Sequence, residues 1–276
     1  MMKDLVVNLS VGERASAAAD YAVSVAATFE ARLTGVAFRY APTAPIAGAE
    51  YIPADLIDAQ ERENAAAAKA AIDRFMAAGK RAGIAVEPLT LGVSYAGVGN
   101  RFSRIARRFD LSIVGQAEPE AGAVEEIIAE AALFESGRPV IVVPYIQKAP
   151  LKLDRVMVCW DGGRAATRAI ADAMPLLQRA GRVEVFIVAK ERGKEDEIEG
   201  ADMATHLARH GLKVEINRTD VGDSDVADII LSHAADADAD FIVRGGYGHS
   251  RLREFVLGGV TRTIFRSMTV PVLMAH

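Results

Sequence analysis

The sequence repeats one strand-and-helix plan twice, and this repeat restricts the folds open to the chain. Residues 4–9 and 154–160 are apolar strands, each followed by a glycine, an arginine and a helical run. Each half closes with a Pro-Val pair and an apolar strand, at residues 139–143 and 271–274. Alternating strands and helices of this length are typical of βαβ units, with right-handed crossovers and a parallel sheet.

The segments between these strands follow the same plan in both halves. Five strands fit each half, which is about 135 residues long. We therefore predict an α/β protein built of two tandem, doubly wound, five-stranded parallel sheets related by a pseudo-two-fold axis. The helical patterns cover residues 16–31, 54–82 and 97–108 in the first half, and 165–180, 194–210 and 224–235 in the second.

The two copies differ in length, and the difference locates an insertion and a boundary. The offset between matching segments is about 150 residues at the start of each half and about 130 later. The segment from residue 40 to about 57, with three prolines and two tyrosines, is the expected insertion. The boundary lies near residues 147–152, between Pro144 and Pro150. This predicts domains at 1–147 and 152–276.

The bulk composition narrows the class of protein. The chain is 51% hydrophobic, carries a formal net charge of -5 and has no basic stripe, which argues against nucleic acid as a main partner. A single cysteine, Cys159, excludes an intrachain disulfide and fits a reducing compartment. No apolar run approaches the roughly 18 residues of a membrane span, and the N-terminus lacks signal-peptide features. We expect a soluble cytoplasmic protein without a membrane partner.

Glycines are concentrated near the C-terminus. The run Gly-Gly-Tyr-Gly at residues 245–248 is followed, after nine intervening residues, by Gly258 and Gly259. It comes after an apolar strand and before a short helical pattern. Glycines at a strand-to-helix turn let backbone N–H groups approach an anion and permit positive φ angles. The pattern predicts a phosphate-binding loop at the carboxyl edge of a parallel sheet.

The spacing Gly245-x2-Gly248-x9-Gly258 resembles the nucleotide loop of the universal stress protein family, G-x2-G-x9-G-[S/T]. The surroundings agree, because a Leu-Gly-x-Val segment follows at residues 257–260 and the first strand of this half ends in Asp161. The resemblance covers the layout of both halves, but its motif is present only in the second.

The resemblance implies a five-stranded parallel sheet and, as in many members, ATP bound across the carboxyl ends of the strands. By resemblance, Asp161 contacts the adenosine, Val188 offers backbone groups to adenine, and Gly245 and Gly248 cradle the phosphates. It further implies a phosphate nest, and ATP with or without Mg as the ligand. That nest comprises Gly258, Gly259 and Val260.

Two positions of the motif depart from the family pattern. Gly259 stands where the family has Ser or Thr, so a hydroxyl is missing, and Thr261 is a candidate replacement two residues on. Arg244, just before the first motif glycine, stands where an apolar residue is usual. Its side chain either neutralises phosphate charge or folds over the pocket and obstructs it.

The first half departs further and is predicted to bind no ATP. Gly115 is followed by Gln116-Ala117-Glu118, with no second motif glycine, and carboxylates in this place would repel phosphates. Either Ser10 or Val11 stands where an aspartate is expected. This half is a scaffold, or its loop at residues 43–53 receives another ligand.

Other polar residues have simpler interpretations. His206 and His210 are four apart on a predicted helix, but without a third ligand they indicate a solvated helix face rather than a metal site. His249 lies within the glycine loop, either against phosphate or in solvent. Trp160, beside Asp161, either stacks on a base or covers the sheet edge.

Three functions follow from these patterns. The first is a stress-response nucleotide binder, a non-enzymatic sensor or regulator that holds ATP or AMP in its second half and signals to an unknown protein partner. The alternative is an interaction module of the same fold that binds no nucleotide. Slow ATP hydrolysis is the weakest, because no convincing general base stands near a γ-phosphate. The two closing strands are expected to pair within the chain as a pseudo-dimer; whether two chains then form a homodimer is left open.

Overall fold

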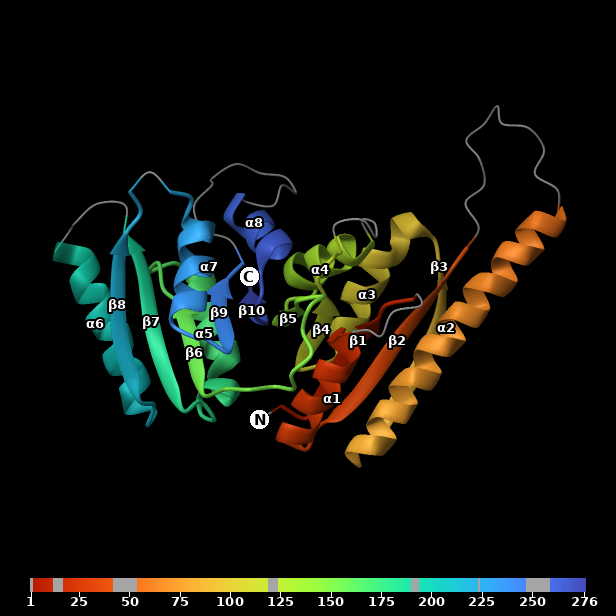
Figure 1. Ribbon diagram of the computed structural model, residues 1–276, viewed down its shortest axis with the longest axis horizontal. Helices are drawn as coiled ribbons and strands as arrows, with labels where there is room; N and C mark the ends of the chain where they lie inside the picture. The colour runs from red at the N-terminus through yellow and green to blue at the C-terminus, as the bar shows by residue number, and fades with distance from the viewer. Residues whose placement is uncertain are drawn as a thin grey trace.

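The chain forms one continuous sheet whose two halves lie side by side (Figure 1). The computed structural model describes residues 2–11, 17–41, 54–118, 124–189, 194–222, 224–246 and 259–276, with only the backbone at 194–199. Within these residues the sheet has ten strands in the order β3-β2-β1-β4-β5-β10-β9-β6-β7-β8. The second five are the mirrored order of the first five, as a tandem repeat requires.

Strands alternate with helices throughout the first half, and every strand pair within it is parallel. A short 3-10 turn, Tyr95–Gly97, precedes α3. The elements are β1 (Asp4–Leu9), α1 (Ala17–Phe29), β2 (Arg32–Tyr40), α2 (Ala54–Ala82), β3 (Val86–Val93), α3 (Val98–Ala106), β4 (Leu111–Gly115), α4 (Val124–Glu135) and β5 (Val140–Val143).

The second half repeats this plan, again with parallel pairs only. The predicted fold class, two doubly wound five-stranded parallel sheets in tandem, is confirmed. The elements are β6 (Arg155–Cys159), α5 (Arg164–Leu177), β7 (Arg182–Ala189), α6 (Lys194–Arg209), β8 (Val214–Asp220), α7 (Val226–Asp236), β9 (Phe241–Gly245), α8 (Gly259–Ser267) and β10 (Val272–Ala275).

The closing strands join the halves. Strand β5 pairs antiparallel with β10, with Val142 opposite Val272 and Ile141 opposite Leu273. All four side chains are buried, with at most 1% of their surface exposed. The pairing expected between the two Pro-Val strands is therefore present, and it removes what would be an open apolar edge on each half.

The insertion in the first half extends beyond the loop. Helix α2 has 29 residues, whereas its counterpart α6 has 16. The extra length thus lies partly in a longer helix, not only in the segment 40–57 where it was expected. Residues 42–53 of that segment lie outside the described residues.

Each face of the sheet carries its own core. One cluster of buried residues joins the sheet to α1, α2, α5 and α6, and the other joins it to α3, α4, α7 and α8. Many helix residues in these clusters are alanines, such as Ala22, Ala26 and Ala169, which are fully buried. Their small side chains let the helices approach the sheet closely. None of the described helices combines the length and the apolar character that a membrane span requires.

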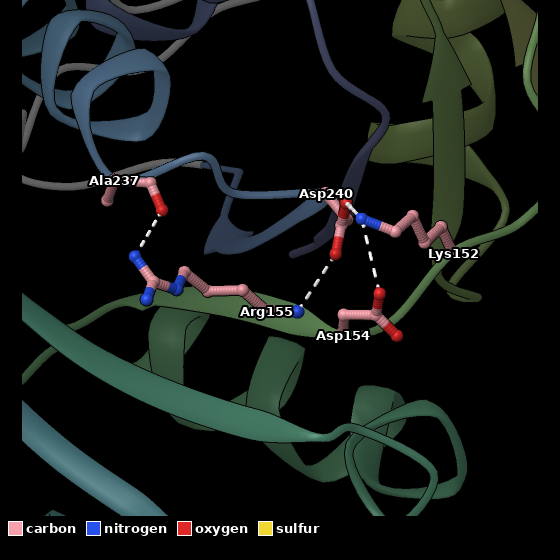
Figure 2. A network of polar contacts seen from close by, with 5 residues as sticks. All are labelled: Lys152, Asp154, Arg155, Ala237 and Asp240. Carbon is pink, nitrogen blue, oxygen red and sulfur yellow. Dashed lines mark hydrogen bonds and ion pairs between the residues drawn. The ribbon is translucent and has the colours of Figure 1, made fainter.

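The segment between the halves is tied to both of them. The amide of Leu151 donates to Ser24 Oγ on α1 at 2.8 Å. Figure 2 shows Lys152 Nζ between the carboxylates of Asp154 and Asp240, at 3.2 and 2.7 Å. Asp240 also accepts the amide of Arg155 at 2.9 Å, while the Arg155 guanidinium donates to the carbonyl of Ala237.

Each half has an aspartate at the amino edge of the sheet, and these two aspartates show which residues of the two halves correspond. Asp110 accepts the amide of Asp4 at 3.1 Å, as Asp240 accepts that of Arg155. The two aspartates also donate their own amides back to Asp4 and Arg155, at 2.8 and 2.9 Å. Asp4 therefore corresponds to Arg155, and counting along the strands makes Ser10 the counterpart of Asp161.

Candidate functional site

The second half has a switch point between β6 and β9. These strands are parallel neighbours, with Val156 opposite Phe241 and Val158 opposite Val243. Helix α5, which follows β6, packs on one face of the sheet, whereas α8, which follows β9, packs on the other. The chain thus leaves the two strand ends in opposite directions, which is the arrangement that places ligand crevices in open α/β sheets.

Asp161 lies at this edge, two residues after β6 ends. Its side chain is exposed, and its Oδ1 accepts the backbone N–H of Gly163 at 2.8 Å. This turn directs the chain into α5. In the first half Ser10, rather than Val11, holds the equivalent position, so no carboxylate stands there.

Gly245 and Gly246 have packing reasons to be glycine. A Cβ on Gly245 would lie 2.6 Å from the backbone nitrogen of Ala166, because the start of α5 presses on the end of β9. A Cβ on Gly246 would lie 2.8 Å from Cδ1 of Leu133, which belongs to α4 in the first half. The Gly246 amide is also used, since it donates to the carbonyl of Ala275 at 2.8 Å.

The start of α8 supplies the other side of the site. Gly259 is exposed, and a Cβ added there would meet nothing within 4 Å. The described residues therefore leave space for the side chain of a serine or threonine at this motif position. Val260 follows and is half-buried. The remaining motif glycines, Gly248 and Gly258, lie outside the described residues, as does His249.

Thr261 acts within the protein. Its side chain is 1% exposed, and its hydroxyl donates to the carbonyl of Gly246 at 2.8 Å. The single hydroxyl proton is thus used to join α8 to the end of β9. The replacement for the missing motif hydroxyl that was considered for Thr261 is not available in this arrangement.

Val188 lies where β7 runs past the end of β6. The β6–β7 register ends with Cys159 opposite Phe186, and the Trp160 amide then donates to the Phe186 carbonyl at 2.9 Å. Val188 follows two residues later, so its backbone lies beyond the carboxyl end of β6. The Trp160 side chain packs against the buried cluster on the α5 face, which favours its role as a cover of the sheet edge.

Arg244 places a buried cation near the carboxyl end of β9. It is 8% exposed, and its Nη1 atom is buried without a hydrogen-bond partner. Burial lowers the pKa of the guanidinium, against the opposing effects of Cys159 and Asp161. Burial also raises the pKa of the Cys159 thiol to about 12, so that the thiol is protonated near neutral pH.

The matching edge of the first half carries carboxylates. Burial raises the pKa of Glu125 most, and hydrogen bonds from its own amide and from Ser10 oppose the shift. The nearby Glu118 raises it further. Gln116, the counterpart of Gly246, is 4% exposed and accepts the amide of Tyr145 at 3.2 Å. The prediction that this half binds no ATP is compatible with these groups and stays a prediction.

The first half also contains an open cavity of about 660 Å³ between the ends of β2 and β3 and the start of α2. Asn64 Nδ2 donates to the Tyr40 carbonyl at 2.7 Å, and Tyr40 stacks on Tyr95 with ring centroids 4.5 Å apart. The charged side chains that line this cavity are two arginines and two carboxylates. These residues are Arg39, Arg62, Asp58 and Glu61.

His206, in the last turn of α6, and His210, one residue after that helix ends, are close, with rings 4.8 Å apart in an edge-to-face arrangement. Among the described residues, no group of three or more histidine, cysteine or carboxylate side chains is placed to hold a metal ion. Within the described part of the chain, the His206–His210 pair therefore has no third ligand beside it.

Comparisons with known proteins agree with this architecture. Residues 152–276 match the model of the universal stress protein family. Universal stress protein Slr1230 of Synechocystis is 27% identical over 139 residues, which are 49% of this chain and 46% of that protein. The chain thus matches less than half the length of this relative.

Solved structures show the same fold over nearly the whole chain. A universal stress protein from Archaeoglobus fulgidus superposes with a TM-score of 0.72 at 17% identity, over 98% of this chain and 97% of that one. A functionally unknown protein from Pseudomonas aeruginosa gives 0.65 at 11% identity, over 99% and 92%. The second half of the chain, residues 152–276, therefore matches the universal stress protein family, and both halves have the fold of the universal stress protein from Archaeoglobus fulgidus.

Proposed function

We propose that this protein binds an adenine nucleotide in its second half and acts as a non-enzymatic sensor or regulator in a stress response. One observation carries the proposal: at the β6–β9 switch point, Asp161 follows the end of one strand, and Gly245 and Gly246 stand at the end of its parallel neighbour. Ligands of open α/β sheets bind at such points.

The geometry supplies partners for both parts of a nucleotide. The second oxygen of the Asp161 carboxylate can accept a ribose hydroxyl, and the backbone at Val188 can meet the edge of adenine. The first amides of α8, at Gly259 and Val260, lack acceptors within their helix and stand at the positive end of its dipole. They suit phosphate oxygens, together with the motif glycines Gly248 and Gly258.

The ligand we propose is ATP, with AMP as the smaller candidate and Mg as the counterion of the triphosphate. The space beside Gly259 fits this ligand, since no atom of the described residues lies within 4 Å of a Cβ placed there. Mg favours phosphate oxygens and water over an all-protein cage, so it needs no ligand cluster of its own.

Catalysis is not part of the proposal. Hydrolysis would need a base aligned with a water molecule at the γ-phosphate. The Cys159 thiol, with its pKa near 12, is protonated, and Asp161 already holds the Gly163 amide. A binder that changes its surface on binding fits these groups better than an enzyme does, and a protein partner would read that change.

Calorimetric titration of the full chain with Mg-ATP tests the proposal. We expect saturable heat, lost in Gly248→Val because a β-branched side chain would enter the phosphate space. The matched control is Gly92→Val in β3, where an added Cβ meets nothing within 4 Å. A folded protein that gives no heat at millimolar nucleotide would refute nucleotide binding.

A second candidate is an interaction module that binds no nucleotide. It is favoured by the close packing of Gly245 and Gly246, because contacts with Ala166 and Leu133 require glycine there without any ligand. Denaturing the purified protein and measuring the supernatant at 260 nm separates the two. Released adenine nucleotide supports the first candidate, and its absence together with silent calorimetry supports the second.

A further inference from the structure

Arg244 is a buried guanidinium, and the fold does not require a charged residue at its position. The equivalent residue of the first half is Val114, because Asp110 and Asp240 occupy matching places four residues earlier. Val114 is 1% exposed and packs in the apolar cluster of its sheet face. The same strand position is thus an ordinary core site in one half and a cation in the other.

Among the described residues, no carboxylate forms an ion pair with the Arg244 guanidinium. Cys159, on the adjacent strand, carries no charge near neutral pH because its thiol pKa is about 12. The Asp161 carboxylate raises the pKa of Arg244 and so opposes the effect of burial. However, Asp161 is exposed, and its carboxylate accepts the amide of Gly163. In the part of the chain that the structure describes, no ion pair joins Asp161 to Arg244, and Nη1 of Arg244 makes no hydrogen bond.

An unpaired buried charge is costly, and a protein retains one where something else compensates it. Arg244 is the next-to-last residue of β9 and lies on the sheet face covered by α7 and α8. The Asp161 carboxylate, which follows the neighbouring strand β6, favours the charged form of the Arg244 guanidinium. A guanidinium there offers several donors in a planar fork, which matches the oxygens of a phosphate group.

We propose that Arg244 binds a phosphate group of the ligand and makes the second half selective for nucleoside 5′-phosphates over nucleosides. This inference rests on the proposed function, because it assumes that a nucleotide enters the β6–β9 crevice. It also accounts for Gly259: a charged donor on β9 takes over the anion contact that the motif hydroxyl would have made.

The test compares AMP, adenosine and inorganic phosphate as titrants of the full chain. The variants are Arg244→Met, Arg244→Lys and Arg266→Met, the last a matched loss of charge at an exposed position in the last turn of α8. We expect wild type to bind AMP about 10- to 100-fold more tightly than adenosine, as one or two charge-assisted hydrogen bonds provide.

Arg244→Met should lose that 10- to 100-fold preference by weakening AMP and leaving adenosine unchanged. Arg244→Lys should keep part of it, and Arg266→Met all of it. Inorganic phosphate should raise the thermal midpoint of wild type and not that of Arg244→Met. In phosphate-free buffer Arg244→Met should be at least as stable as wild type, because an apolar side chain already suits Val114 at this position.

The outcomes separate the two levels of the proposal. If Arg244→Met still prefers AMP to adenosine as wild type does, the role of Arg244 is overturned and nucleotide binding stands. If wild type binds AMP and adenosine equally, the role of Arg244 is overturned. This outcome depends on wild type alone, so it holds even if a variant fails to fold. If wild type binds neither AMP nor adenosine, both this inference and the proposed function are refuted.

Discussion

Leu133 of the first half packs directly against Gly246 of the second. A Cβ on Gly246 would lie 2.8 Å from Cδ1, 3.0 Å from Cδ2 and 3.1 Å from Cγ of Leu133. Leu133 is 1% exposed, so its side chain has little space to withdraw. The start of the glycine turn is therefore shaped by a helix from the other half of the chain.

This contact predicts that Gly246→Ala destabilises the protein. Forcing one methyl group into a packed core typically costs about 1–3 kcal/mol. Leu133→Ala should cost about 2–5 kcal/mol alone because it leaves a cavity. The double variant should be less destabilised than the sum, since the new methyl group enters the space that Leu133 vacates. Denaturant unfolding of the four proteins measures this coupling, and strict additivity would contradict the contact.

Thr261→Val should destabilise the chain by about 1–3 kcal/mol. The substitution keeps the shape but removes the hydroxyl that donates to the Gly246 carbonyl, and leaves that oxygen with one partner fewer. Thr263→Val on the same helix is the matched control, because it has the same effect on helix propensity. Equal unfolding midpoints for the two variants would argue against a structural role of the Thr261 hydrogen bond.

Gly259→Ser should be tolerated and should strengthen binding of ATP. A serine side chain has open space at this position and restores the hydroxyl of the family motif. One added hydrogen bond corresponds to about 2- to 10-fold in affinity. Gly259→Ala adds the same Cβ without the hydroxyl and should leave the affinity unchanged. Calorimetry on both variants distinguishes the hydroxyl from a general effect on α8.

Glu125→Gln should change the pH dependence of stability. The folded pKa of Glu125 is raised above its ordinary value of 4.5, so the folded protein binds its proton more tightly than the unfolded chain does. Stability should therefore fall as pH rises from about 4.5 through the folded pKa, and the loss should persist above it. The wild-type free energy of unfolding should decline relative to Glu125→Gln over this interval. A difference that is constant with pH would contradict the buried carboxyl.

The sequence predicts the architecture well because the repeat marks the strands twice. The apolar runs at residues 4–9 and 154–160, and the two Pro-Val strands, identify the sheet centre and the pairing of β5 with β10. The sequence pattern does not identify the outer strands β3 and β8 or helix α4. Strand β3 mixes exposed and half-buried residues, so its pattern lacks the apolar run that identifies a central strand.

The candidate site is predicted less completely, because its decisive contacts join distant segments. Spacing identifies the glycine motif and Asp161, but it cannot tell whether Ser10 or Val11 matches Asp161; the register decides for Ser10. Nor does it reveal that the Thr261 proton is used by Gly246, or that Leu133 packs there. The unusual Arg244 is visible in the sequence, but its burial and unpartnered Nη1 come only from three dimensions.

The antiparallel pairing of β5 with β10 has a consequence for how the sequences of the two halves can diverge in evolution. Two separate identical subunits joined through such strands would come apart on dilution and would have to change together. Here a covalent link keeps both partners at a high effective concentration, whatever the amount of protein. One copy can therefore discard its ligand chemistry and specialise as a permanent brace, while the other copy evolves its chemistry independently.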